Sequence, residues 1–165
     1  MQHVQTRSTT STLVLTAVLI ALATLFTMYT KIPVPGIRGY FNVGDVVIMT
    51  SALLLGRKYG AYIGAIGPAL ADLFLGYAVF VPITFVVKGI EGYLVGTVYN
   101  NKTTTSALVA TILGGIVIVA GYFIAEYFVF DPGVAIASIL TNTIQAVMSV
   151  IISMILYAIL RKRLG

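Results

Sequence analysis

Two oppositely charged side chains, Lys88 and Glu91, lie three residues apart in the otherwise apolar stretch TFVVKGIEG, residues 84–92. Thr84 belongs to the same stripe of a helix, because residues three and four positions apart are neighbours on a helix surface. An ionised side chain that faces hydrocarbon costs at least about 2.5–3.5 kcal/mol on insertion scales, so such residues normally face the interior of a helix bundle. The pair therefore marks either a structural ion pair or part of a binding site for a polar solute.

Other polar side chains recur inside apolar segments elsewhere in the chain. The amides of Asn142 and Gln145 lie one turn apart on one helix face, where they can bind ring nitrogens or hydroxyl groups of a ligand. Three carboxylates occupy comparable segments: Asp45, Asp72 and Glu126. Pairing of the lysine with one of the acids would hold helices together, whereas a shared polar pocket would bind a solute, and both interpretations stay open.

The composition places these side chains in a membrane. Apolar residues make up 59% of the 165 residues and charged residues only 9%. The mean hydropathy is +1.02, well outside the range of an ordinary soluble domain. The chain has no cysteine, and its single histidine, His3, lies in the polar N-terminal tail. Thiolate metal sites are therefore excluded, zinc chemistry is disfavoured, and no cofactor is expected.

Apolar runs separated by polar breaks predict an all-α integral membrane protein with six transmembrane helices, which form a single domain over residues 1–165. The second and third helices are short for spanning segments, so we expect them to be tilted, re-entrant or shielded by the irregular segment before them. The expected helices lie at residues 11–29, 43–56, 60–76, 80–99, 105–129 and 133–161.

The distribution of basic residues predicts the orientation. If both termini are cytoplasmic, the inside breaks and tails carry seven basic residues and the outside breaks carry two, which agrees with the positive-inside rule. The inside residues are Arg7, Arg57, Lys58, Lys102, Arg161, Lys162 and Arg163, and the outside residues are Lys31 and Arg38. The basic C-terminal end is thus interpreted as a membrane anchor, and no nucleic acid is expected as a partner.

A cleaved signal peptide is an alternative interpretation of the N-terminal segment, with a small-residue cleavage site at residues 21–23. The apolar run, however, continues past this site through Met28. Because loss of the first helix would also spoil the topology, a first transmembrane helix is favoured.

With this orientation, the intramembrane polar groups gather on the outer side. At a rise of 1.5 Å per residue, Lys88 lies roughly 12 Å and Glu91 roughly 16 Å below the outer end of their helix. Asn142 and Gln145 lie about 14–18 Å down, and the inner half is almost purely apolar. This one-sided arrangement predicts an outward-facing pocket, because a channel or proton relay would need polar residues through both halves.

The segment before the second helix, TKIPVPGIRGYFNVGD at residues 30–45, contains prolines and glycines that prevent a helix. We expect an outer loop over the pocket, in which Arg38, Tyr40 and Asn42 supply a donor, an aromatic face and an amide for a flat polar ligand. A plain connector is the alternative. Tyr122 adds aromatic surface at the outer rim, although an interfacial aromatic belt would explain it as well.

Small residues recur at helical spacing in several of the expected helices. The glycines are Gly60 and Gly64 in the third helix and Gly89, Gly92 and Gly96 in the fourth. Such stripes predict that the helices approach each other closely. Ala17 and Ala21 form an Ala-x-x-x-Ala motif in the first helix, which packing alone explains but which also suits the seat of a partner helix.

The sequence contains none of the common catalytic motifs. There is no G-x-x-x-x-G-K-[ST] phosphate loop, no H-E-x-x-H and no G-x-S-x-G, so the chain cannot hydrolyse ATP by itself. A transporter component with a pocket closed on its inner side would therefore need ATPase partners. A small intramembrane enzyme that uses Asp45, Asp72 and Glu91 is disfavoured, because no metal or nucleophile arrangement accompanies them.

Two runs of the chain stand out: GYFNVGDVVIMTSALLLGRKYGAYIGAIGPALADLFLGY at residues 39–77 and PITFVVKGIEGYLVG at residues 82–96. These runs resemble the membrane substrate-binding (S) components of energy-coupling factor (ECF) vitamin importers, most closely the hydroxymethylpyrimidine and pyridoxine group. The resemblance implies a vitamin-binding pocket under the first loop and a multi-pass location in a bacterial cell membrane. It also implies a transmembrane T subunit and two cytoplasmic ATPases as partners.

Residue roles follow from the resemblance as well. Ala17 and Ala21 match the family's Ala-x-x-x-Ala surface for the T subunit. The family's pocket draws on the first loop and helices four to six. Applied to this chain, the family's pocket suggests Arg38, Asn42, Lys88, Glu91, Tyr122, Asn142 and Gln145. With Tyr40, Asp45 and Thr84, which the residue pattern adds, these are the expected substrate-binding residues. The chain has no tryptophan, on which the family's thiamine binders stack their ligand, and this weakens thiamine as the ligand.

These observations together predict a high-affinity vitamin-binding subunit of an ATP-driven importer, for hydroxymethylpyrimidine or a pyridoxine-type vitamin B6. Two alternatives stay open. One is a stand-alone proton-coupled carrier of small solutes, and the other is an S component for another vitamin, such as thiamine or riboflavin.

Overall fold

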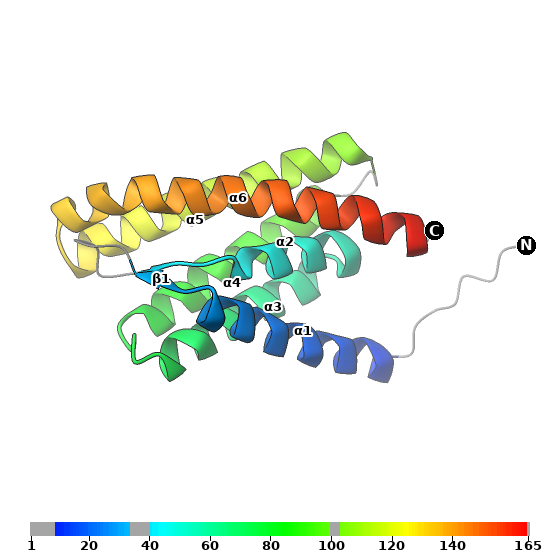
Figure 1. The fold of residues 1–165 in the computed structure, drawn as a ribbon, viewed down its shortest axis with the longest axis horizontal. Helices are drawn as coiled ribbons and strands as arrows, with labels where there is room; N and C mark the ends of the chain where they lie inside the picture. Colours follow the sequence, from blue (N-terminus) through cyan, green and yellow to red (C-terminus); the bar gives the residue numbers. More distant parts are fainter. Residues whose placement is uncertain (1–8, 34–39, 100–102, 165) are drawn as a thin grey trace, which may run out of the picture.

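The computed structural model describes residues 9–33, 40–99 and 103–164, and these fold into six helices and one short pair of strands (Figure 1). The helices are α1 (Thr9–Tyr29), α2 (Gly44–Leu55), α3 (Arg57–Phe74), α4 (Phe80–Val98), α5 (Thr104–Val129) and α6 (Pro132–Leu164). Strands β1 (Ile32–Pro33) and β2 (Tyr40–Phe41) pair antiparallel between α1 and α2. The helical prediction is confirmed, with helix ends that differ from the expected ones by three residues or fewer.

One predicted break is wrong in extent. The stretch GRKYG was expected to separate the second and third helices over five residues, but only Gly56 interrupts them, and Arg57 already begins α3. Gly56 has a φ of 85°, a left-handed conformation that glycine adopts without steric cost and that ends α2. The basic residues Arg57 and Lys58 therefore lie in the first turn of a helix rather than in a loop.

Helix α2 lies at the centre of the bundle and contacts each of the other five helices. It has only twelve residues, or about 18 Å of helix, and nine of them are buried. Ile48 and Met49, both fully buried, project into two different core clusters: Ile48 packs with Ala23 and Ile63, whereas Met49 packs on the side of α4, α5 and α6. A helix this short is tolerated because protein surrounds it.

The remaining helices surround α2. In Figure 1, α5 and α6 run side by side and α1 and α3 lie across α2 from them, whereas α4 packs against both α3 and α5. Four of the six described helices, α1, α4, α5 and α6, are long and apolar enough to cross a bilayer. Their outward faces carry large exposed apolar side chains such as Phe128 and Leu140, which are suited to contact with lipid.

The predicted glycine stripes bring α3 and α4 into direct backbone contact. A methyl group at Gly92 would lie 2.1 Å from the carbonyl oxygen of Gly60, and one at Gly64 would lie 2.1 Å from the carbonyl oxygen of Lys88. Both distances are far below van der Waals contact, so only glycine fits. This packing fixes the position of Lys88 relative to α3, because the lysine's own backbone forms part of the contact.

Replacing Gly92 with Ala is expected to destabilise the protein by about 1–3 kcal/mol, because the added methyl group forces α3 and α4 apart. Thermal unfolding of the purified protein in detergent measures the effect. Gly89→Ala is the matched control on the same helix: its methyl group would lie 3.2 Å from the Ala65 Cβ, a contact that a small shift relieves. Equal melting temperatures for the two variants would contradict the proposed role of close backbone packing.

Candidate ligand-binding site

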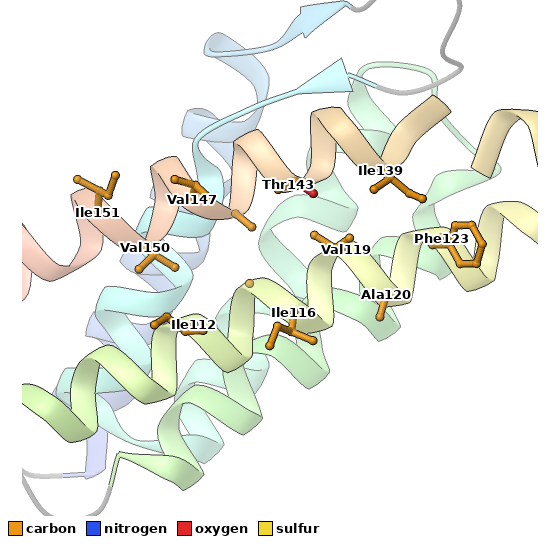
Figure 2. A pocket seen from close by; sticks show the side chains of 12 residues that line it. Ile112, Ile116, Val119, Ala120, Phe123, Ile139, Thr143, Val147, Val150 and Ile151 are labelled. Atoms are coloured by element: carbon orange, nitrogen blue, oxygen red, sulfur yellow. The ribbon is translucent and has the colours of Figure 1, made fainter. Parts of the chain in front are cut away.

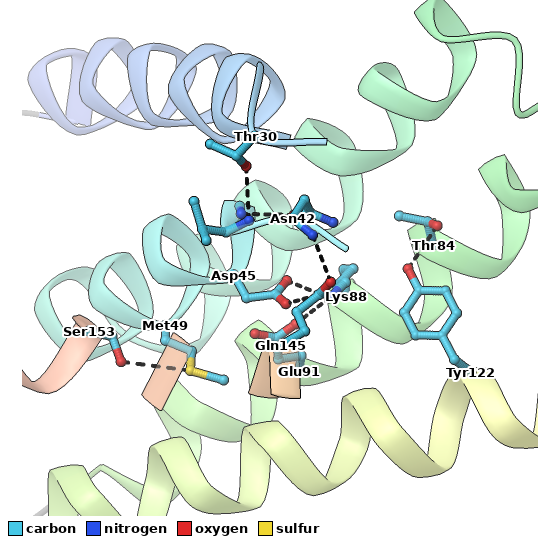
Figure 3. A network of polar contacts seen from close by, with 12 residues as sticks. Thr30, Asn42, Asp45, Met49, Thr84, Lys88, Glu91, Tyr122, Gln145 and Ser153 are labelled. Carbon is cyan, nitrogen blue, oxygen red and sulfur yellow. Dashed lines mark hydrogen bonds and ion pairs between the residues drawn. The ribbon is translucent and has the colours of Figure 1, made fainter. Parts of the chain in front are cut away.

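A buried polar network joins three helices beside the N-terminus of α2. Lys88 on α4 forms an ion pair through Nζ with Oδ1 of Asp45, in the first turn of α2. Gln145 on α6 donates from Nε2 to Oδ2 of the same carboxylate at 2.7 Å (Figure 3). Lys88 is 1% exposed and Asp45 is not exposed at all, so the charges are held away from solvent and lipid. The position of Asp45 at a helix N-terminus also favours its negative charge.

Glu91 adds a second carboxylate to this lysine. Its Oε2 atom lies 3.7 Å from Lys88 Nζ, and the residue is fully buried. Among the described residues neither carboxylate oxygen of Glu91 has a hydrogen-bond partner. Of the two interpretations of the charged pair, the structure shows an ionic contact: Lys88 pairs with Asp45, and Glu91 lies at a longer distance from the same ammonium group.

The chain just before α2 is tied into the same network. The backbone N–H of Asn42 donates to Gln145 Oε1 at 3.0 Å, and the Asn42 side-chain oxygen accepts from the N–H of Gly44 at 2.8 Å. The N–H of Val43 donates to the hydroxyl of Thr30 at 3.0 Å. These contacts join the residues that follow β2 to Thr30 at the end of α1, to α2 and to α6. The expected loop over the pocket includes residues 34–39, which lie outside the described residues.

A small cavity of about 40 Å³ opens beside the network. Helices α1, α3, α4, α5 and α6 and the residue Asn42 all contribute to its walls. The lining residues are Thr27, Asn42, Pro68, Asp72, Phe80, Thr84, Lys88, Tyr122, Glu126, Ser138, Thr141, Asn142 and Gln145. Polar and aromatic side chains dominate this set, which suits a small polar ligand with a flat ring.

One wall of the cavity is aromatic. The hydroxyl groups of Thr84 and Tyr122 lie 2.9 Å apart in a hydrogen bond between α4 and α5. Lys88 Nζ lies 5.4 Å from the centre of the Tyr122 ring, within range of a cation–π contact. Phe80 lies on the same cavity and packs against Phe130, with ring centroids 5.4 Å apart. Such rings present faces on which a planar ligand can stack.

The residues expected to bind substrate fall into three groups. Those that line the cavity are Asn42, Thr84, Lys88, Tyr122, Asn142 and Gln145. Asp45 and Glu91 lie outside the lining and form ion pairs with Lys88. Tyr40 contributes backbone to β2, and Arg38 lies outside the described residues.

Several lining residues were absent from the predicted site. Thr27, Pro68, Phe80, Ser138 and Thr141 were not among the expected binding residues, and neither were Asp72 and Glu126, although the sequence placed these two acids on the outer side. A periodic signal was available on α6, where the lining residues recur at positions 138, 141, 142 and 145, the spacing of one helix face. Thr27 is a single lining residue from α1, so no periodic pattern of polar residues in the sequence indicates it.

The half of the bundle away from the cavity, which was predicted to be almost purely apolar, contains polar side chains. Buried hydroxyl groups occur there at Thr50, Thr111, Ser149 and Ser153. Thr111 and Ser153 donate to backbone carbonyl groups one turn earlier, and Ser153 also contacts the sulfur of Met49 at 3.8 Å. Hydroxyl groups satisfied in this way are compatible with a helix interior. Among the described residues, the buried acidic side chains and Lys88 lie toward the end of the bundle that holds the cavity.

Two larger hollows on the surface have a different character. One, of about 570 Å³, lies between α5 and α6 and is lined by apolar side chains such as Ile116, Phe123 and Val147, with Thr143 as its one hydroxyl (Figure 2). The other, of about 930 Å³, lies among α1, α2 and α6. Neither offers a charged lining residue. The small polar cavity is therefore the better candidate for a polar ligand despite its size.

Comparison with known proteins agrees with this architecture. A family model described as the S component of an ECF-type riboflavin transporter matches residues 7–162. An uncharacterised protein of Pyrococcus woesei is 43% identical over 145 residues, covering 86% of this chain and 96% of that protein. The thiamine precursor transporter HmpT of Lactococcus lactis subsp. cremoris (strain MG1363) is 29% identical over 148 residues, covering 89% of this chain and 83% of HmpT.

Two solved structures share the fold. A structure of the S component of a bacterial ECF transporter superposes with a TM-score of 0.75 at 21% identity, covering 93% of this chain and 96% of that one. The S component for biotin from an ECF-type ABC transporter superposes with a TM-score of 0.63 at 20% identity, covering 89% and 90%. The chain belongs to the S-component family of ECF transporters, whose members are integral membrane, substrate-binding subunits that partner with a T subunit and ATPases and are not enzymes.

Proposed function

We propose that this chain is the high-affinity vitamin-binding subunit of an ATP-driven ECF importer, and that its ligand is hydroxymethylpyrimidine. The observation that carries the proposal is the buried cavity lined by aromatic rings, carboxylates and amides from five helices. The similarity to a transporter of a thiamine precursor supports a pyrimidine ligand over pyridoxine. Riboflavin is the second candidate, because the matching family model bears its name.

The proposed topology has six membrane-spanning helices with both termini in the cytoplasm of the cell. Four helices are long enough to cross by themselves, and α2 and α3 pack against them. Cationic residues gather at the end opposite the cavity: Arg57 lies over the Tyr93 ring and Arg161 over the Tyr157 ring. Tyr157 in turn hydrogen-bonds to Tyr99, which joins the ends of α4 and α6. This basic end is placed on the inner side by the positive-inside rule.

The proposed role of each residue in the site follows from whether its polar group already has a hydrogen-bond partner within the protein. The side chain of Gln145 contacts both Asp45 and the Asn42 backbone, so it mainly fixes the network. Asn142, one turn away on the same face of α6, lines the cavity without a hydrogen bond to this network. We assign Asn142 the direct hydrogen bond to the ligand, Tyr122 and Phe80 the stacking, and Lys88 the closed inner end of the site.

Ligand entry requires movement around the cavity. A pocket that encloses a small organic ligand measures roughly 300 Å³ or more, several times the cavity volume found here. Helices or side chains around the site must therefore separate to admit the vitamin. Because the inner side of the cavity is closed by the ion-pair network, release toward the cytoplasm depends on the partner T subunit and ATPases.

Calorimetric titration of the purified protein in detergent tests the substrate. We expect hydroxymethylpyrimidine to bind with a Kd below about 1 μM, corresponding to more than about 8 kcal/mol, and pyridoxine, thiamine and riboflavin to bind more weakly. Asn142→Ala is expected to weaken binding about tenfold, the effect of one lost hydrogen bond in a buried site. Thr143→Ala is the matched control, since Thr143 faces the apolar hollow between α5 and α6. Tighter binding of riboflavin would overturn the assigned ligand.

A further inference from the structure

The wall of the cavity that lies away from Lys88 carries several hydrogen-bond acceptors. Two carboxylates, Asp72 on α3 and Glu126 on α5, belong to the lining, and each is 3% exposed. The only lining cation among the described residues is Lys88, which is already paired with Asp45. The lysine is therefore already engaged away from Glu126, and a ligand that fills the cavity meets a wall that contains carboxyl groups.

Two atoms on this cavity lack a partner. Oε2 of Glu126 and Oγ1 of Thr27 are buried and make no hydrogen bond within the described part of the chain. The two residues come from α5 and α1, so they line the cavity from different helices. A buried carboxylate oxygen without a donor costs more free energy than an ordinary lost hydrogen bond, which makes it a marker for a ligand donor.

The chemistry of the carboxylate limits what such a ligand can be. An ionised carboxylate only accepts hydrogen bonds, so it is satisfied by an amino group or a protonated ring nitrogen and not by a bare ring nitrogen or carbonyl group. The neighbouring lining residues Ser138 and Asn142 carry groups that can donate or accept, and they adapt to either kind of ligand. Of the two lining carboxylates, Glu126 is the one with an oxygen that lacks a hydrogen-bond donor among the described residues, so it is the group expected to discriminate between donor and acceptor edges.

Resting on the proposed function, we infer that Glu126 is a specificity-determining residue that accepts a hydrogen bond from the exocyclic amino group of an aminopyrimidine ligand. The ligand then lies with its amino edge toward α5 and its opposite edge toward the network around Lys88. A site built to receive a donor rejects an analogue that lacks it, because the buried carboxylate is left unpaired. The discrimination therefore depends on Glu126 more than on the aromatic wall, because a pyrimidine ring stacks on that wall with or without its amino group.

Paired titrations of the full chain in detergent test this assignment. The two probes are hydroxymethylpyrimidine and its analogue without the amino group. The wild type is expected to prefer the amino compound about 100-fold or more. Glu126→Gln keeps the shape of the side chain but removes its charge, and it is expected to reduce that preference at least about tenfold while changing binding of the analogue little. Glu126→Asp, which keeps the charge, is expected to retain part of the preference.

Asp131→Asn is the matched control, because it removes a carboxylate from the exposed turn before α6, outside the cavity. If Glu126→Gln loses affinity for both probes equally, the role of Glu126 is structural. If its preference for the amino compound is unchanged, Glu126 has no role in recognition. Either result overturns the assignment of Glu126 but not the proposed substrate. A wild type that binds neither pyrimidine overturns the proposed substrate and this inference together. Melting temperatures of the variants separate loss of fold from loss of recognition.

Discussion

Replacing Lys88 with Met is expected to lower the free energy of unfolding by about 3–5 kcal/mol, the typical cost of removing one partner from a buried ion pair. The lysine is the cation between Asp45 and Glu91, and all three residues are buried. Without it, two carboxylates face each other with no compensating charge. Thermal unfolding in detergent, measured beside ligand titration, will show a large fall in melting temperature.

The partner variants distinguish an ion pair from a ligand contact. Combining Lys88→Met with Asp45→Asn removes both charges of the closest pair, so we expect the double variant to regain part of the lost stability. Arg57→Met is the matched control, because it removes an exposed cation at the opposite end of the bundle and should change stability by less than about 1 kcal/mol. A Lys88→Met protein that melts like the wild type but has lost affinity would instead place the lysine in direct contact with the ligand.

Replacing both Ala17 and Ala21 with Trp is expected to abolish vitamin uptake while leaving ligand affinity within about threefold of the wild type. Both alanines are exposed on α1, whereas the contribution of that helix to the cavity, Thr27, is buried and lies more than one turn further along. Bulky side chains on a small-residue surface block the close approach of a partner helix. Uptake in cells that express the complete importer, co-purification of the T subunit and calorimetry of the isolated chain measure the three effects.

Leu140→Trp provides the matched control for this surface. It adds bulk to a different apolar position, 68% exposed on α6, and should leave both uptake and binding intact. If the double alanine variant loses ligand binding as well as uptake, then the α1 surface also supports the site, and the separation between partner docking and binding is wrong. If uptake persists, the T subunit docks elsewhere.

The helices themselves were predictable, because hydropathy and turn residues act locally. Each of the six expected helices exists within the described residues, and the glycine stripes that implied close packing meet in the predicted way at Gly60 and Gly92. The extent of the break after α2 was not predictable from polarity, because Arg57 and Lys58 read as loop residues but are held in a helix. Long basic side chains tolerate either state at a membrane surface, so the position of Gly56 decided the boundary.

The composition of the site was predictable only in part. Charged and amide side chains in apolar helices stand out in a sequence, because their transfer into lipid costs free energy. Lys88, Asn142 and Gln145 were predicted for this reason. Hydroxyl-bearing residues such as Thr27 and Ser138 carry no such signal, because a helix in lipid accepts them when they bond to their own backbone. Their contribution to the cavity depends on which helices meet.

From the order of residues, a membrane-embedded helical protein could be predicted, with its intramembrane acids and Lys88 toward one side, since composition and depth along a helix are local properties. The packing of the helices set which of these groups pair with each other and which face the cavity. It paired Lys88 with Asp45 behind the cavity, engaged Gln145 in holding them, and left Asn142 and Glu126 on the lining. The physical reason is that a polar group in a bundle takes the nearest partner in space, and that partner can come from a helix 43 or 100 residues away.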